Sequence, residues 1–221
     1  MRPALAALAA AVAACALLPG TALARLTEVG SSTAQGRPSC PRNPCLAVSR
    51  TTGVQMRAAG RRDPYLIPRN GSIVAFTVSL GRPSNTQMAF FNKNLGGGPS
   101  ARLTVLRPAR RRNNSFRFIV KAQSEVVQLS SYLGHTAQFA LDRSLPVRKN
   151  DLLALTVPTW APVLAVGLGN DTTWRASRPS PCSDNEAFQQ TAQQQIGGLA
   201  QYQCEYKTAR MTYSATLIST P

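Results

Sequence analysis

Histidine and acidic residues are scarce in this sequence. Its 221 residues include one histidine, His135, and nine aspartates and glutamates. A Ser-His-Asp or Cys-His catalytic arrangement would therefore depend on His135, which follows Gly134 just before an expected strand. A histidine in such a turn is far more often exposed or hydrogen-bonded than catalytic. No Gly-x-Ser-x-Gly nucleophile motif occurs either.

Motifs for metals, cofactors and phosphates are also missing. The sequence contains neither a Cys-x-x-Cys pair nor an Asp-x-Asp-x-Asp loop, so neither a zinc site nor a calcium loop is indicated. Residues Gly96-Gly97-Gly98 resemble a phosphate-binding loop only in glycine content, because neither Lys-Ser nor Lys-Thr follows them. We expect no cofactor, no metal site and no catalytic residue.

A glycosidase would need two carboxyl groups about 5 to 9.5 Å apart. The sequence does not bring two such carboxylates together, because the candidates are scattered along the chain. These candidates are Asp142, Asp151, Asp171, Asp184, Glu186 and Glu205.

No apolar run is long enough to span a membrane. The run from Ala4 to Leu18 is shorter than the roughly 20 residues that a membrane-spanning helix needs. It follows Arg2 and precedes the small-x-small triplet Ala22-Leu23-Ala24, an arrangement typical of a secretory signal peptide. We predict that residues 1–24 are removed and that the secreted chain begins at Arg25.

The cysteines fit export. Cys15 ends the run Val12-Ala13-Ala14-Cys15, which resembles a lipobox, so a lipoprotein anchored through Cys15 is the alternative to a conventional signal peptide. The other four cysteines form an even set, as expected of an exported protein with disulfides. We predict the pairs Cys40–Cys45 and Cys182–Cys204, because each encloses a short segment of sequence.

Positive charge dominates the surface chemistry. The chain has 25 Lys and Arg and a formal net charge of +16, which favours anionic partners such as wall polymers, acidic lipids or acidic polysaccharides. Only four of the 25 are Lys, and a high-GC genome would give the same arginine-rich composition without any function. Four arginines cluster beside the turn-forming pair Asn113-Asn114 and are candidate anion-binding residues, although a solvated hairpin tip is the alternative: Arg107, Arg110, Arg111 and Arg112.

Short alternating segments predict an antiparallel β-sandwich. In Ser72–Leu80, for example, Val74, Phe76 and Val78 would share one face. Strands at intervals of roughly 8–12 residues are typical of a single sandwich domain, here 45–221, after a loosely ordered lead-in at 25–44. The expected strands are Ser72–Leu80, Arg102–Arg107, Ser115–Ala122, Glu125–Leu129, Thr136–Leu141, Leu152–Val157, Val163–Gly167 and Met211–Ile218.

One segment has a different pattern. Ser183 and Glu186 are spaced as a capping box, and the Gln- and Ala-rich residues Ala187–Ile196 follow them. A short helix and a loop are about equally compatible with this stretch, because it has few apolar positions.

Three segments occur in an order that carries a resemblance: Arg102–Pro108, Leu145–Leu153 and Arg210–Thr216. The chain from Val54 onward resembles secreted, functionally uncharacterised β-sandwich proteins of high-GC Gram-positive bacteria. It departs from their pattern at Asn150, where Gly is usual, and at Ser214, where Asn is frequent. The resemblance implies a jelly-roll-like fold and supplies no catalytic residue.

Two tryptophans are candidates for carbohydrate stacking. Trp160 and Trp174 both fall in expected connections, where an exposed indole can stack on a sugar ring. The alternative is that each folds back to cap the open end of the sandwich.

Together these features favour a secreted, non-catalytic β-sandwich that binds an anionic or carbohydrate polymer of the cell envelope. A secreted hydrolase of polysaccharides or esters and a structural or adhesive surface protein are the alternatives. We expect no specific nucleic-acid partner and no transmembrane segment, and the sequence leaves the oligomeric state open.

Overall fold

The computed structural model describes residues 24–31, 36–109, 116–179, 182 and 192–219. The predicted signal peptide, including Cys15, lies outside these residues apart from Ala24, as do Arg110, Arg111 and Arg112. Within the described part, no helix is both long enough and apolar enough to cross a bilayer.

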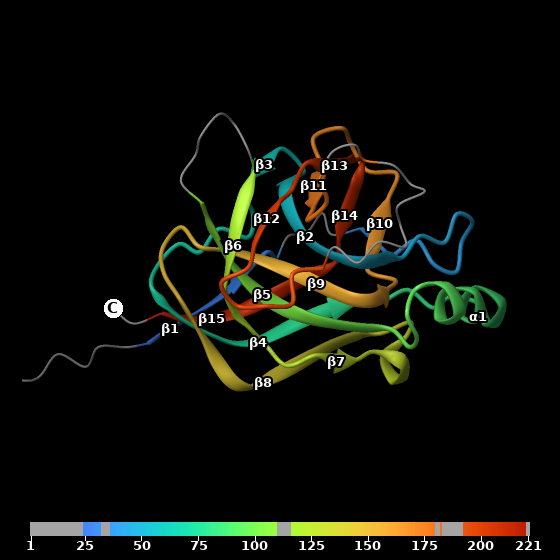
Figure 1. Cartoon of the computed structure of the whole chain (residues 1–221), viewed down its shortest axis with the longest axis horizontal. Coiled ribbons are helices and arrows are strands. Elements are labelled where there is room, and N and C mark those ends of the chain that lie inside the picture. The colour runs from blue at the N-terminus through green and yellow to red at the C-terminus, as the bar shows by residue number, and fades with distance from the viewer. Residues whose placement is uncertain (1–23, 32–35, 110–115, 180–181, 183–191, 220–221) are drawn as a thin grey trace, which may run out of the picture.

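Two antiparallel sheets make up most of the molecule (Figure 1). The small sheet consists, in spatial order, of β1 (Arg25–Val29), β15 (Tyr213–Ser219), β4 (Gly71–Ser79) and β8 (Thr136–Val147). The large sheet consists of β12 (Leu199–Gln201), β6 (Arg117–Gln123), β5 (Ser100–Pro108), β9 (Leu152–Ala161), β2 (Val48–Ala58), β11 (Thr173–Ala176) and β13 (Cys204–Lys207). Two short strands pair onto it, β3 (Arg61–Arg62) on β2 and β7 (Val127–Gln128) on β5.

The remaining elements are short. Strands β10 (Leu164–Val166) and β14 (Ala209–Met211) form a two-stranded ladder of their own. Helix α1 (Asn85–Asn94) lies at one end of the molecule, and the 3₁₀ turn η1 (Ser130–Tyr132) precedes β8 (Figure 1).

The main core lies between the two sheets. Phe76 and Val78 of the small sheet and Leu153 and Leu155 of the large sheet are fully buried in one apolar cluster. Because successive side chains of a strand point to opposite faces, Leu152 belongs to a second cluster on the far face of the large sheet. Burial on both faces explains why β9 reads as a continuous apolar run rather than an alternating one.

The predicted all-β, antiparallel fold is confirmed, but several elements were not predicted, among them β2 and α1. Strand β2 contains Thr51, Thr52 and Gly53, which obscure an alternating apolar pattern. Helix α1 begins with a capping box in which the Gln87 amide N–H donates to Ser84 Oγ at 3.3 Å and the Ser84 amide N–H donates to Gln87 Oε1 at 2.8 Å. That Ser-x-x-Gln spacing was the available signal for the helix.

The expectation of a loosely ordered lead-in is wrong for its first residues. Strand β1 pairs with β15 along its whole length, from Arg25 opposite Ser219 to Val29 opposite Ala215. Only Val29 of this edge strand is buried, so its sequence shows no alternation. Backbone pairing holds the strand, and the Glu28 carboxylate accepts hydrogen bonds from the side-chain hydroxyls of β15.

Both predicted disulfides are present. Cys40 is bonded to Cys45, and Cys182 is bonded to Cys204 at the start of β13. The second bond ties residue 182 to the large sheet. Of the Gln-rich segment between them, residues 192–196 are described and contain no helix, whereas 183–191 lie outside the described residues.

Candidate anion-binding site

The site begins with the β2–β3 hairpin. Ala58 pairs with Arg61, which leaves the two-residue turn Ala59-Gly60, and both turn residues have positive φ angles, 49° and 79°. This is the mirror-image turn that matches the twist of antiparallel strands, and Gly adopts it without strain. The amide N–H of Ala59 donates to Thr172 Oγ1 at 3.1 Å, so the tip is anchored to the loop before β11.

A β-bulge next to the hairpin directs two consecutive side chains to the same face. On β11, Thr173 pairs with Arg57 while Trp174 pairs with Gln55, so Met56 is the extra residue of β2. Met56 and Arg57 consequently line one pocket. The buried Gln55 holds the bulge, because its Nε2 donates to the carbonyls of Arg57 and Thr173 and its Oε1 accepts from the Met211 amide.

Cross-strand register then places three cations in one row. Arg62 on β3 pairs with Arg57 on β2, Arg57 pairs with Thr173 on β11, and Thr173 pairs with Lys207 on β13. Directly opposed residues point to the same face, so the row runs across four strands over about 14 Å at a strand spacing of about 4.8 Å.

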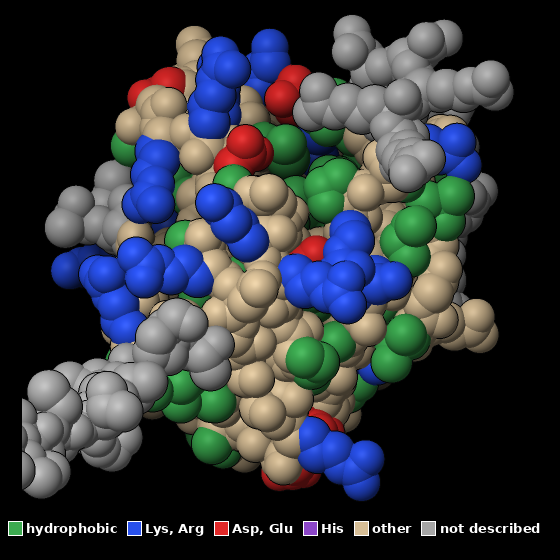
Figure 2. Space-filling model, turned by 90° about the vertical axis from the view of Figure 1, so that its left-hand side faces the viewer, with side chains coloured by type: hydrophobic (Ala, Val, Ile, Leu, Met, Phe, Trp, Pro, Cys, Tyr) green, Lys and Arg blue, Asp and Glu red, His purple; other side chains and the backbone are tan. Residues whose placement is uncertain are grey.

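These residues line a pocket of about 450 Å³, which we call the cationic pocket. Its lining is Met56, Arg57, Arg62, Asp63, Phe116, Asn170, Thr173, Arg175, Glu205 and Lys207, with four cations and two carboxylates. Lys and Arg also outnumber Asp and Glu on the face of the molecule shown in Figure 2.

Arg175 is the one cation of the pocket with several protein partners. Its guanidinium lies 3.7 Å above the Phe116 ring, and its Nη2 is 3.4 Å from Glu205 Oε2. Its Nη1 donates to the carbonyls of Tyr202 and Gln203. Arg175 therefore fixes Phe116 as a wall of the pocket, a cation–π contact worth on the order of 1 kcal/mol.

The three cations of the row differ from Arg175. Within the described residues, the side chains of Arg57, Arg62 and Lys207 make no hydrogen bond or ion pair, and Arg62 and Lys207 are exposed. Exposed guanidinium and ammonium groups without a protein partner keep their full capacity to bind an incoming anion.

A second pocket of about 420 Å³, which we call the apolar pocket, adjoins the first. The two share Met56, Asp63 and Phe116. Phe118 and Leu152 are almost fully buried, at 5% and 4% exposure, and Leu66 is 38% exposed. The lining residues of the apolar pocket are Met56, Asp63, Leu66, Pro108, Ala109, Phe116, Arg117, Phe118, Asn150 and Leu152.

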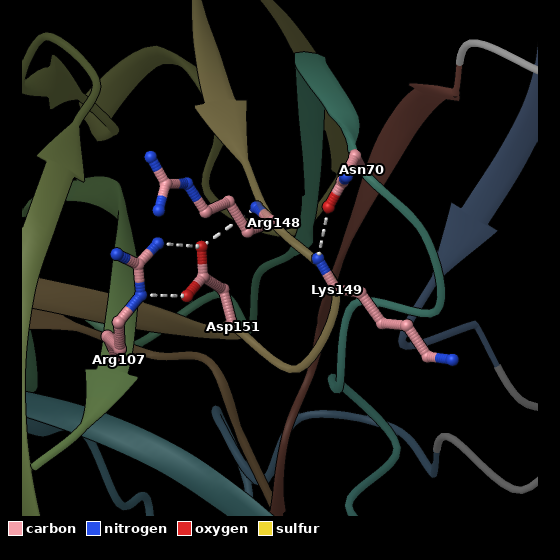
Figure 3. A network of polar contacts seen from close by, with 5 residues as sticks. All are labelled: Asn70, Arg107, Arg148, Lys149 and Asp151. Carbon is pink, nitrogen blue, oxygen red and sulfur yellow. Dashed lines mark hydrogen bonds and ion pairs between the residues drawn. The ribbon is translucent and has the colours of Figure 1, made fainter.

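The β8–β9 turn that carries Asn150 is fixed by a buried carboxylate (Figure 3). Asp151 accepts hydrogen bonds from Arg107 Nε at 2.7 Å, from Arg107 Nη2 at 2.9 Å and from the Arg148 amide at 2.9 Å. The Lys149 amide donates to Asn70 Oδ1 at 2.9 Å. Asn150 has a φ of 71°, a left-handed conformation that Gly and Asn tolerate best.

This pairing corrects the expectation for Arg107. Its bidentate contact with Asp151 raises the pKa of the Arg107 guanidinium, chiefly through the hydrogen bonds and secondarily through charge attraction. Arg107 is thus a positioning residue for the β8–β9 turn rather than a free anion-binding group. Arg110, Arg111 and Arg112 lie outside the described residues, in the connection between the paired strands β5 and β6.

We expect Arg107→Ala to lower the free energy of unfolding by about 2 kcal/mol, because the Asp151 carboxylate would stay buried with only the Arg148 amide as partner. Arg148→Ala is the matched control and should change it by less than about 0.5 kcal/mol, since Arg148 contributes only its backbone. Urea unfolding curves of both variants test this. Equal effects would show that the Arg107–Asp151 pair does not stabilise the turn.

Neither of the two tryptophans named as candidates for carbohydrate stacking has an exposed indole. Trp160 lies within β9 at 0% exposure and Trp174 within β11 at 5%. Trp160 packs against Phe91 of α1 at the end of the sandwich, and Trp174 stacks on Tyr206 with ring centroids 4.4 Å apart. Trp160 matches the alternative in which an indole caps an end of the fold, whereas Trp174 is part of the main core.

The hydrolase alternative gains no support from the described residues. His135 is exposed, and within that part of the chain its imidazole makes no hydrogen bond. Asp151 and Glu205 are paired with arginines, and Asp184 and Glu186 lie outside the described residues. The described residues contain no group of three or more His, Cys, Asp or Glu that could hold a metal ion.

No protein-family model matches the chain, and neither a curated protein nor a solved structure is significantly similar to it. What the two pockets can bind therefore follows from their own chemistry.

Sequence reasoning missed the cationic pocket because its residues come from four distant segments. Arg57 and Arg62 lie in a hairpin that was not predicted, and Lys207 is about 150 positions away in sequence. The signals that were available are the Ala59-Gly60 turn pair and the Arg61-Arg62 doublet that follows it.

Proposed function

We propose that the protein is a secreted, non-catalytic β-sandwich that binds an anionic polymer of the cell envelope in the cationic pocket. The observation that carries this proposal is the row of Arg62, Arg57 and Lys207, which lines an open pocket. Among the described residues, these three side chains have no hydrogen-bond or ion-pair partner. The two disulfides and the net charge of +16 are compatible with an extracellular protein that meets polyanions.

The shape of the row favours an extended ligand over a single ion. Three cations spread over about 14 Å can contact successive charges of a polymer, and each arginine can bind a phosphate or carboxylate through two parallel hydrogen bonds. The burial of Trp160 and Trp174 leaves neither indole as a platform on which a neutral sugar chain could stack. An anionic polymer therefore fits better than a neutral one.

The test removes the row and compares it with an equal loss of charge elsewhere. The site variant carries Arg57→Ser, Arg62→Ser and Lys207→Ser. The control variant carries Arg42→Ser, Arg82→Ser and Lys93→Ser, three exposed positions at the α1 end of the molecule. Both variants lose the same formal charge.

We expect the site variant to bind poly(glycerol phosphate) teichoic acid at least about tenfold more weakly at low salt, because each lost ion pair is worth about 0.5 kcal/mol or more. The control should lose less than about threefold, and the difference should shrink as salt is added. Titration calorimetry of each variant with the polymer measures both affinities and tests this expectation. Equal losses from both variants would mean that only net charge matters and would refute a localised site.

A further inference from the structure

We propose that the ligand of the cationic pocket is lipid-linked, with an alkyl chain that enters the adjoining apolar pocket. This inference rests on the proposed function and names the class of its ligand. It accounts for a hollow of about 420 Å³ beside the cations whose lining includes two nearly buried apolar side chains, Phe118 and Leu152.

The two pockets share a wall, so one ligand can occupy both. Met56 and Phe116 line each of them, and Arg175 holds the Phe116 ring in place from the cationic side. Charge complementarity sets the orientation of the ligand across the two pockets. The anionic group belongs beside Arg57, Arg62 and Lys207. The apolar chain belongs against Leu66, Phe118 and Leu152, which line the apolar pocket.

Asp63 lies where the cationic and apolar pockets meet, so it faces the part of the ligand that links the anionic group to the alkyl chain. It lines both pockets, and its carboxylate makes no hydrogen bond within the described residues. An anion next to this carboxylate would be repelled, whereas the hydroxyl groups of a glycerol or sugar unit can donate to it. The site is thus arranged for an alkyl chain, a hydroxylated linker and a polyanion, in that order, as in a glycolipid-anchored teichoic acid.

The experiment uses alkyl phosphates below their micelle concentrations. Affinity for the full mature chain should rise from butyl to octyl phosphate by about threefold to fourfold per methylene, as expected when a methylene leaves water. Inorganic phosphate should bind most weakly. An affinity independent of chain length would overturn the proposal.

Two variants test whether the dependence of affinity on chain length arises in the apolar pocket. Leu66→Glu puts a charge at the mouth of the apolar pocket and should abolish the dependence on chain length. Leu46→Glu is the matched control at 41% exposure, compared with 38% for Leu66, and should keep it. Thermal unfolding confirms that both variants fold. Chain-length dependence that survives in Leu66→Glu, or that is lost equally in both variants, would refute this location.

The intact polymer separates this proposal from the one on which it rests. Lipid-linked teichoic acid should bind the unaltered chain at least about tenfold more tightly than the same polymer after alkaline deacylation, and Leu66→Glu should remove that advantage. Equal binding of the two forms overturns the lipid inference and leaves polyanion binding intact. Failure of the deacylated polymer to depend on Arg57, Arg62 and Lys207 overturns the proposed function instead.

Discussion

Above pH 10 we expect the protein to unfold cooperatively, with its free energy of unfolding falling by up to about 4 kcal/mol per pH unit. Burial raises the pKa of Tyr65 to about 12 and raises the pKa values of Tyr202 and Tyr213 well above the ordinary 10. The unfolded chain releases these three protons near pH 10 while the folded chain retains them, so stability present below pH 10 is lost as the pH rises. Three groups at about 1.36 kcal/mol per unit give the slope.

The surroundings of these tyrosines explain why they resist ionisation. The Tyr213 hydroxyl donates to the Leu153 carbonyl at 3.1 Å, and the Tyr65 hydroxyl donates to the Tyr213 carbonyl. A phenolate at either position would face a carbonyl oxygen without water. The positive charge of Arg210 acts in the opposite direction and lowers the pKa of Tyr65, but less than burial raises it.

Tyrosinate absorbance and far-UV circular dichroism, recorded together against pH, test this expectation. The protein has five tyrosines, and the three buried ones should ionise in a single step that coincides with the loss of β-structure. Tyr65→Phe should reduce the slope by about a third. Ionisation of all five without any loss of structure would contradict the buried positions.

Trp160→Ala should lower the free energy of unfolding by about 3 to 5 kcal/mol, the range found for a large aromatic side chain removed from a core. The indole is fully buried, and its ring lies 5.0 Å from that of Phe91. Its Nε1 donates to Asn92 Oδ1 at 3.1 Å and to the Gly97 carbonyl at 2.8 Å. Trp160 therefore joins α1 and the loop after it to the large sheet.

Urea unfolding with Phe90→Ala as the control checks this prediction. Phe90 lies on the same helix but is 58% exposed, so its loss should cost less than about 0.5 kcal/mol. A cost for Trp160→Ala similar to that of Phe90→Ala would show that α1 is not held by the indole.

The sequence was informative where local chemistry determines structure. Alternating residues in Ser72–Leu80 predicted the strand now seen as β4, and the expected strand Arg102–Arg107 is seen as β5. The short cysteine spacings predicted both disulfides. It was uninformative where tertiary contacts dominate. Strand β1 depends on backbone pairing with β15, and Trp160 is placed by its contact with α1 rather than by its neighbours in sequence.

The candidate site could not be predicted for the same reason. A row of cations across strands is set by register, and a shift of one residue in β2 would send Arg57 to the opposite face. That register depends on the bulge at Met56, which the buried Gln55 side chain holds through hydrogen bonds to two carbonyls. None of these contacts is visible in a local pattern. Conversely, the arginine-rich stretch that the sequence emphasised contributes Arg107 to an ion pair with the buried Asp151 carboxylate.

Amide chemical-shift mapping during titration with poly(glycerol phosphate) tests the central claim most directly. The account predicts saturable shifts concentrated at Arg57, Arg62, Thr173 and Lys207 and in the hairpin that joins β2 to β3. Residues of α1 and of the Cys40–Cys45 loop should stay unchanged. Shifts spread evenly over all exposed cations, or centred on the α1 end, would contradict a binding site in the cationic pocket.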